Sequence, residues 1–252
     1  MRADGDCLVL GTVMDGARMK VEGSLRVEGG IESAEVTVGG SVEILRGVSG
    51  NGGGIIRAGG DLRARFLDHA TVSVAGDLVV ETSILHCTLR ADGDVRLTSG
   101  RGIIAGGRVV CGGNMEAGII GGAFGTDTYV SAGLAPEELQ ELEDLFQRRG
   151  ELARELVQAR STLRLAKGQE EKVKRAKYRL LCLSREARQA DEARASLFAR
   201  MRPRPNAMVL ARMNLRAGVH GRISGVPYSV ARDSGPARVF RRGVSPAIWP
   251  TV

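Results

Sequence analysis

Histidine and cysteine are residue types often used for acid–base, nucleophilic or metal chemistry, and in this chain they are isolated. The three histidines, His69, His86 and His220, have no HExxH motif and no second ligand at helical spacing. The four cysteines are widely scattered and form no CxxC pair: Cys7, Cys87, Cys111 and Cys182. We therefore expect no catalytic residue, no metal site, no cofactor and no disulfide framework.

Glycine-rich segments could do chemistry by cradling phosphate groups. The chain has 35 glycines among 252 residues, but no Gly-Lys-Ser/Thr P-loop and no GxSxG motif. Residues 100–105 read Gly-Arg-Gly-Ile-Ile-Ala and fit GxGxxA only superficially, because strand-like residues follow where a dinucleotide site needs a helix. The Gly-Asp pairs also lack the GGxGxD spacing of calcium-binding β-helices. These patterns indicate neither a small-molecule substrate nor calcium.

Arginine gives the chain its basic character and raises nucleic acid as a partner. The net charge is +7, and residues 203–252 contain eight Arg, no Lys and one acid. Nine arginines in or just before this segment could neutralise phosphates: Arg202, Arg204, Arg212, Arg216, Arg222, Arg232, Arg238, Arg241 and Arg242. Only Tyr228, Phe240 and Trp249 are candidates for stacking on bases. Because the whole chain uses 31 Arg to 5 Lys, a solvated basic face is favoured, and nucleic-acid binding stays an alternative.

The first half of the chain is a repeat built around glycine. The repeat glycines are 14 to 20 residues apart until a last spacing of 6, and a polar residue follows each one. They are Gly5, Gly23, Gly40, Gly60, Gly76, Gly93, Gly107 and Gly113. Apolar and polar residues alternate on both sides, as in Val36 and Val38 before Gly40 and Val42 and Ile44 after it. Alternation with period two predicts short strands, and the Gly-polar pairs predict tight corners between them.

Self-similarity at this spacing is typical of a β-solenoid. We predict a mainly β protein with a right-handed parallel β-helix of ~17-residue coils over residues 1–133. The acids that follow corner glycines are expected to bond the turn backbone: Asp6, Asp61, Asp77 and Asp94. The last spacing is expected to place two faces of one coil in succession and to close the stack. A β-sandwich is disfavoured, because it would show turn signals every ~8–12 residues.

Two enzyme classes use β-helices. Left-handed acyltransferases follow a strict hexapeptide period with a catalytic histidine, which a period of ~17 residues does not fit. Right-handed polysaccharide lyases and hydrolases carry clusters of acids or arginines on one sheet face. Arg63 and Arg65 beside Asp68 form the one such cluster in the repeat. A glycan-active enzyme is therefore the less favoured alternative.

Residues 134–203 have the pattern of two long helices. Pro136 followed by Glu137 and Glu138 predicts a helix start, Gly168 predicts a break, and Pro203 predicts the end. Two apolar stripes at 3–4 spacing, interrupted by Arg149 and Arg194, predict an antiparallel coiled-coil hairpin. Its seam residues are expected to form a core first and an oligomer interface second, so we expect a homo-oligomer. They are Leu142, Leu145, Leu152, Leu156, Leu163, Val173, Leu180, Leu183 and Leu197.

Residues 204–252 return to alternation and predict a short β segment that packs on the solenoid or extends it. Such strands would satisfy an otherwise exposed sheet edge. Elsewhere the chain has no apolar run near the ~20 residues of a membrane helix. The first residues contain no apolar signal region, so a cytoplasmic protein is expected.

Several motifs resemble the flagellar assembly protein A family of bacteria. They are residues 56–70 (IRAGGDLRARFLDHA), 74–78 (VAGDL), 84–87 (ILHC), 100–107 (GRGIIAGG) and 119–122 (IIGG), followed by Thr126 and Gly133. The resemblance covers essentially all of residues 1–235. It implies a β-helix interrupted by a coiled-coil hairpin and followed by a short β tail.

The same resemblance implies a cytoplasmic, non-enzymatic protein with no catalytic residue, linked to flagellar assembly or cell-pole organisation through protein partners. Members of the family usually carry a further N-terminal domain before the β-helix. The present chain starts inside the repeat, so we expect it to be a fragment or a short form.

Overall fold

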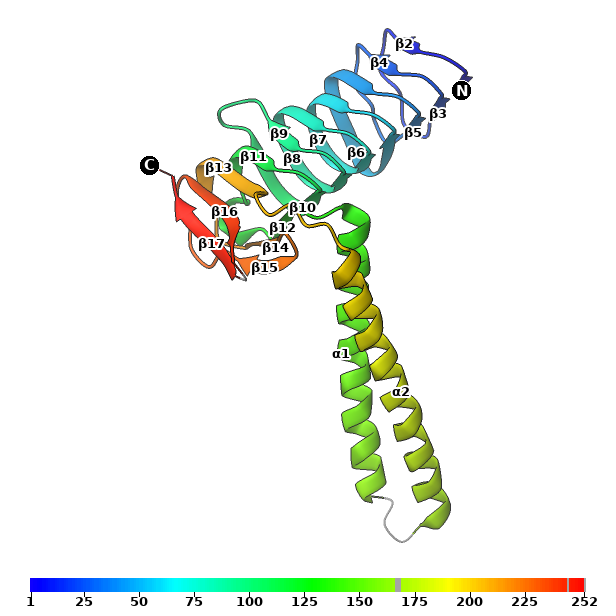
Figure 1. Cartoon of the computed structure of the whole chain (residues 1–252). Helices are drawn as coiled ribbons and strands as arrows, with labels where there is room; N and C mark the ends of the chain where they lie inside the picture. Colours follow the sequence, from blue (N-terminus) through cyan, green and yellow to red (C-terminus); the bar gives the residue numbers. More distant parts are fainter. Residues whose placement is uncertain (166–168, 244, 252) are drawn as a thin grey trace. The chain divides into compact units, whose positions relative to one another are not determined.

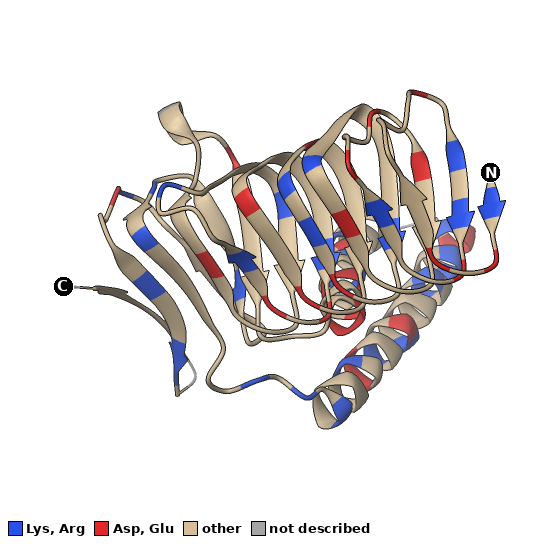
Figure 2. Cartoon of the chain, turned by 90° about the horizontal axis from the view of Figure 1, so that it is seen from above, with Lys and Arg blue, Asp and Glu red and all other residues tan. Residues whose placement is uncertain are grey.

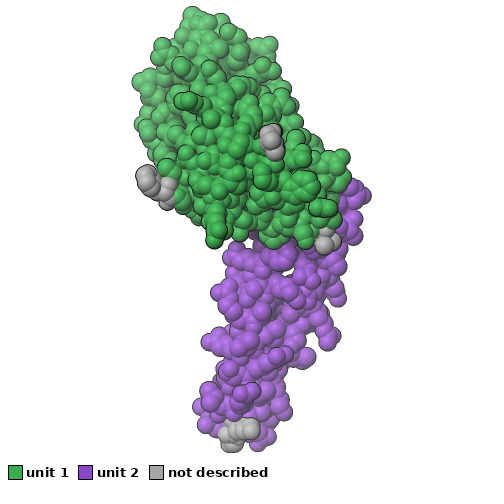
Figure 3. All heavy atoms as spheres, turned by 90° about the vertical axis from the view of Figure 1, so that its left-hand side faces the viewer, with its two compact units in different colours: residues 1–136, 203–252 green, residues 137–202 purple. Residues whose placement is uncertain are grey.

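The structure is a computed structural model that describes residues 1–165, 169–243 and 245–251, without the side chain of residue 124. The chain divides into two compact units, which Figure 3 colours separately. The solenoid unit comprises Met1–Pro136 and Pro203–Val252, and the helical unit comprises Glu137–Arg202. The segment after the helices, predicted to pack on the solenoid or to extend it, shares a unit with the solenoid.

The solenoid unit is a β-solenoid of about seven turns, with parallel strands stacked coil on coil (Figure 1). Before the helices, its strands are β1 (Arg2–Ala3), β2 (Cys7–Val9), β3 (Arg18–Val21), β4 (Leu25–Val27), β5 (Glu35–Val38), β6 (Val42–Ala58), β7 (Leu62–Val74), β8 (Leu78–Ala91), β9 (Val95–Leu97), β10 (Ile103–Cys111), β11 (Met115–Ile120) and β12 (Thr128–Ala132). A short 3-10 helix, η1 (Ala123–Gly125), precedes β12. The predicted solenoid is confirmed.

Inward side chains of successive coils stack in columns, and this stacking forms the core. One column runs through seven coils, with each member at most 1% exposed. Its members are Leu25, Val42, Leu62, Leu78, Val95, Met115 and Val209. Full burial of such a side chain contributes about 1.5–3 kcal/mol, and no coil could bury this face alone.

The last glycine spacing suggests that the stack closes at Gly113. The stack instead continues beyond this residue. The chain leaves the solenoid after β12 and returns as β13 (Met208–Leu215) and β14 (Val219–Ile223). β13 pairs in parallel with β11, and β14 pairs in parallel with β12, so both strands add a further coil. The strands β15 (Val226–Ser229), β16 (Ala237–Arg242) and β17 (Ser245–Pro250) then pair antiparallel with β14, β13 and β16 respectively.

The helical unit consists of α1 (Pro136–Leu165) and α2 (Glu170–Arg200). Ion pairs join the helices in opposite order along the chain, from Glu141 with Arg200 to Arg148 with Glu186 (2.6 Å), so the helices are antiparallel. The predicted break at Gly168 lies outside the described residues. Neither described helix combines the length and the apolar character that a membrane span requires.

Candidate interaction surfaces

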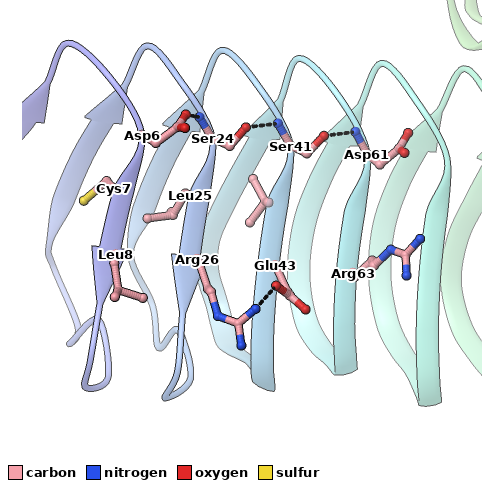
Figure 4. Close-up of a pocket in the computed structure, with 11 residues that line it drawn as sticks. Asp6, Cys7, Leu8, Ser24, Leu25, Arg26, Ser41, Glu43, Asp61 and Arg63 are labelled. Carbon is pink, nitrogen blue, oxygen red and sulfur yellow. Dashed lines mark hydrogen bonds and ion pairs between the residues drawn. The ribbon is translucent and has the colours of Figure 1, made fainter.

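One corner of the solenoid carries a ladder of polar side chains, each bonded to the backbone of the next coil (Figure 4). The Asp6 carboxylate accepts from the Ser24 N–H (2.7 Å), and the Ser24 hydroxyl accepts from the Ser41 N–H (3.3 Å). The ladder continues with acceptors Ser41, Asp61, Asp77, Asp94 and Asn114, the last of which accepts from the Met208 N–H. Hydrogen bonds to carboxylates are among the stronger ones in proteins. These polar residues thus hold coil to coil and bridge to the strand that follows the helices.

The ladder explains the glycine that precedes each corner residue. A Cβ added at Gly76 would overlap the Asp61 carboxylate and lie 3.0 Å from the Gly60 carbonyl carbon. Gly60 and Gly93 face the same obstacle from Ser41 and Asp77. None of these glycines has a left-handed φ. Close approach of the preceding coil, rather than backbone conformation, therefore requires glycine at this corner.

The last two predicted corner glycines, Gly107 and Gly113, lie at different corners of the solenoid. Gly113 follows Gly93 in the ladder column, because its N–H donates to the Gly93 carbonyl (2.9 Å). Gly107 instead pairs with Cys87 at another corner and has a left-handed φ of 75°. The last short spacing thus marks two corners of one coil, and Gly107 does not belong to the ladder column.

A shallow groove of about 640 Å³ lies beside the ladder on β2, β4, β6 and β7 (Figure 4). Arg26 and Glu43 form an ion pair in it (2.5 Å), and Arg63 lines its end. Arg63 belongs to the predicted cluster of Arg63, Arg65 and Asp68 that suggested glycan chemistry. The other two members of this cluster have different neighbours. Arg65 lies 3.9 Å from Glu81, and Asp68 bonds the His69 ring (2.8 Å). The geometry therefore does not bring the cluster together around one substrate position.

Two histidines that are isolated in sequence are neighbours in the solenoid. His69 and His86 stack with ring centroids 4.8 Å apart, and both have a left-handed φ near 48°. Gly106 occupies the corresponding position in the next coil, where a Cβ would overlap the His86 ring. The described residues include no group of three or more His, Cys, Asp or Glu side chains that could hold a metal. His69 and His86 are one coil length apart in the sequence, and this spacing is the signal that could have predicted their contact.

Two thiols and a phenol are buried rather than available for chemistry. Burial raises the pKa of Cys87 to about 11 and raises the pKa of Cys111 further. The same cause raises the pKa of Tyr228, whose hydroxyl donates to the Val130 carbonyl (2.9 Å). A thiol must ionise to act as a nucleophile, so neither of these thiols is activated.

Several C-terminal arginines bond within the solenoid unit, whereas Arg232, Arg238 and Arg242 are exposed. Arg212 donates to the carbonyls of Leu97 (2.5 Å) and Ser99 (2.9 Å). Of the predicted stacking residues, Tyr228 is buried, whereas Trp249 is 44% exposed and packs edge-on against Phe240. Figure 2 shows basic and acidic residues interspersed along the strands. The arrangement therefore gives little support to a nucleic-acid interface.

The predicted hairpin seam lies where α1 and α2 meet. Four of its residues are buried (Leu142, Leu152, Leu183 and Leu197), and the other five are half-buried (Leu145, Leu156, Leu163, Val173 and Leu180). Leu152, Ala159 and Leu183 form one apolar cluster. Both polar interruptions of the stripes meet a single acid, because Arg149 and Arg194 lie 2.7 and 3.7 Å from Asp191. The seam thus serves as the core of the helical unit.

Comparison with known families gives one result that covers nearly the whole chain. A family model described as the Flagellar Assembly Protein A beta solenoid domain matches residues 2–245. Neither the curated proteins nor the solved structures contain a significant match.

Proposed function

Because the chain belongs to the flagellar assembly protein A family, we propose that it is a non-enzymatic scaffold in flagellar assembly or cell-pole organisation. It acts in the bacterial cytoplasm through contacts with proteins. The observation that carries this proposal is the corner ladder. Its acids and hydroxyls are committed to backbone N–H groups of the next coil, from Asp6 to Asn114. Polar side chains that are bonded to the backbone in this way stabilise a rigid stack and are not free to act on a substrate.

We further propose that the scaffold self-associates and that the helical unit mediates this contact as a coiled coil. The support is the distribution of apolar side chains on the two helices. The seam accounts for their inward faces, yet Phe146, Val157, Leu181 and Phe198 are 40 to 69% exposed. Contiguous apolar patches on a protein surface mark sites of protein–protein contact, and these side chains are the candidates for such a patch.

Deletion of the gene tests the proposed role. We expect a strain without it to grow normally but to lose swimming motility, with absent or mislocalised flagella on staining. Complementation with the full chain should restore both. Normal flagella in the deletion strain would contradict the flagellar role and would leave the architecture unchanged.

A further inference from the structure

A second stripe, apolar in its middle and charged at its two ends, runs along the exposed side of α1, one residue after the buried seam. We call it the outer stripe, and its members follow 3–4 spacing: Glu143, Phe146, Gly150, Ala153, Val157 and Arg160. Phe146 is 40% and Val157 is 64% exposed, and the two small residues between them are exposed as well. A groove of about 330 Å³ lies beside its middle, lined by Phe146, Gly150 and Ala153 of α1 and by Ala187 and Asp191 of α2. The stripe thus combines two apolar knobs with a hollow between them.

Gly150 has no explanation within the chain. It lies in the interior of a 30-residue helix, where glycine is less favourable than alanine. Apart from its chain neighbours and the adjacent backbone of its own helix, a Cβ added at Gly150 would meet no described atom within 4 Å. Glycine at a helix surface permits a neighbouring backbone to come close. None of the described residues packs into this space, so Gly150 points to a contact with another molecule.

The outer stripe is complementary to itself when read in the opposite direction. If a second α1 is placed antiparallel, with a two-fold axis between Gly150 and Ala153, Phe146 lies opposite Val157. Gly150 then lies opposite Ala153, and Glu143 lies opposite Arg160. A surface that matches its own reverse is what an isologous two-fold interface requires.

The charges of α1 favour the same orientation. Residues 137–147 contain five acids and no base, whereas residues 148–165 contain five arginines and two acids. An antiparallel second copy brings the acidic end against the basic end, and a parallel copy would place like charges together. Complementary charge sets the orientation of association more than its strength.

We propose that two copies of this chain associate by packing their α1 helices antiparallel across the outer stripe. This inference rests on the self-association in the proposed function and specifies its surface. Six residues a side is far below the roughly 20–30 of a standard interface. The dimer is therefore weak and concentration-dependent.

Sedimentation of the full chain over a wide concentration range tests the dimer. We expect the mass to rise from the monomer value of 26.8 kDa toward twice that value. Gly150→Leu should weaken the dimer at least tenfold, because the side chain fills space that the partner needs. The same variant should keep or raise the melting temperature of the helices, since leucine is the better helix former. Ser196→Leu, which adds leucine at an exposed position of α2, is the matched control and should leave the dimer intact.

A charge swap separates this surface from any other. Glu143→Arg and Arg160→Glu should each weaken the dimer, because each places like charges opposite one another. The double variant should restore it. The two positions are about 25 Å apart along one helix, so the restoration cannot come from a contact within one chain.

Three outcomes would overturn the proposal. A monomer at all concentrations would refute the dimer, while the motility test would still decide the proposed role. A dimer that is insensitive to Gly150→Leu would place self-association on another surface. A double charge variant as weak as the single variants would refute the antiparallel register.

Discussion

The corner ladder predicts that Gly76→Ala destabilises the solenoid through one specific neighbour. Gly76 has no left-handed φ, so the backbone itself would accept alanine. The added Cβ would overlap the Asp61 carboxylate, which accepts from the Asp77 N–H (2.8 Å). Overpacking costs about 1–3 kcal/mol, and displacing the carboxylate loses a hydrogen bond worth about 1 kcal/mol. We therefore expect the free energy of unfolding to fall by about 2–4 kcal/mol.

A double-mutant cycle with Asp61→Ala isolates that cause. Asp61→Ala alone should cost about 1 kcal/mol, because water can replace the lost acceptor at this exposed corner. In the double variant the overlap with the carboxylate is gone, whereas the approach to the Gly60 carbonyl carbon (3.0 Å) remains. The double variant should therefore be less destabilised than the sum of the singles by about 1–2 kcal/mol.

Urea denaturation followed by circular dichroism, with hydrogen exchange at the Asp77 amide, measures these effects. The matched control is Gly100→Ala, the same substitution at a glycine of the solenoid unit with free space around it and no left-handed φ, which should be neutral or stabilising by up to about 1 kcal/mol. Additive costs in the cycle, or a neutral Gly76→Ala, would refute the close-approach explanation of the corner glycines.

Three further predictions concern the rest of the chain. Leu152→Asp combined with Leu156→Asp should abolish the helical circular dichroism signal and self-association but keep the β signal, because charges enter the seam. Unchanged spectra and mass would contradict the role of the seam. Cys87 should resist alkylation in the folded protein at pH 8. Because burial raises the pKa of this thiol, the free energy of unfolding should fall as the pH rises from 9.0 through about 11. A gel shift that disappears between low and moderate salt would instead support the nucleic-acid alternative.

The solenoid could be predicted because its signal is local and repeated. Each corner places a glycine and a polar residue next to one strand of alternating apolar residues, and this pattern needs no knowledge of the neighbouring coils. The helices could be predicted equally well, because proline, acidic residues and 3–4 spacing of apolar residues mark them along the chain. Even the two interrupting arginines of the seam were visible, although their shared acid was not.

The details that escaped prediction depend on register between coils. Coil length varies, because β6 carries irregularities between Ile44 and Gly47 and between Ser49 and Gly54. A constant spacing therefore cannot tell which corner a glycine occupies, and Gly107 was placed in the wrong column. The contact between His69 and His86 escaped for the same reason. Two residues one coil apart meet only if the register between their strands is known.

The insertion of the helices between β12 and β13 has a consequence for the order in which the chain folds. β12 ends at Ala132, and β13, which pairs with β11, begins only at Met208. Closing a flexible loop of about 75 residues would cost about 4 kcal/mol of chain entropy. The helical unit brings its own ends together, however, because the Arg202 N–H donates to the Glu138 carboxylate (3.3 Å). If the helices form first, the effective loop shrinks to about 10 residues and its closure to about 2 kcal/mol. Formation of the helical unit before the final coil therefore lowers the entropy cost of adding that coil.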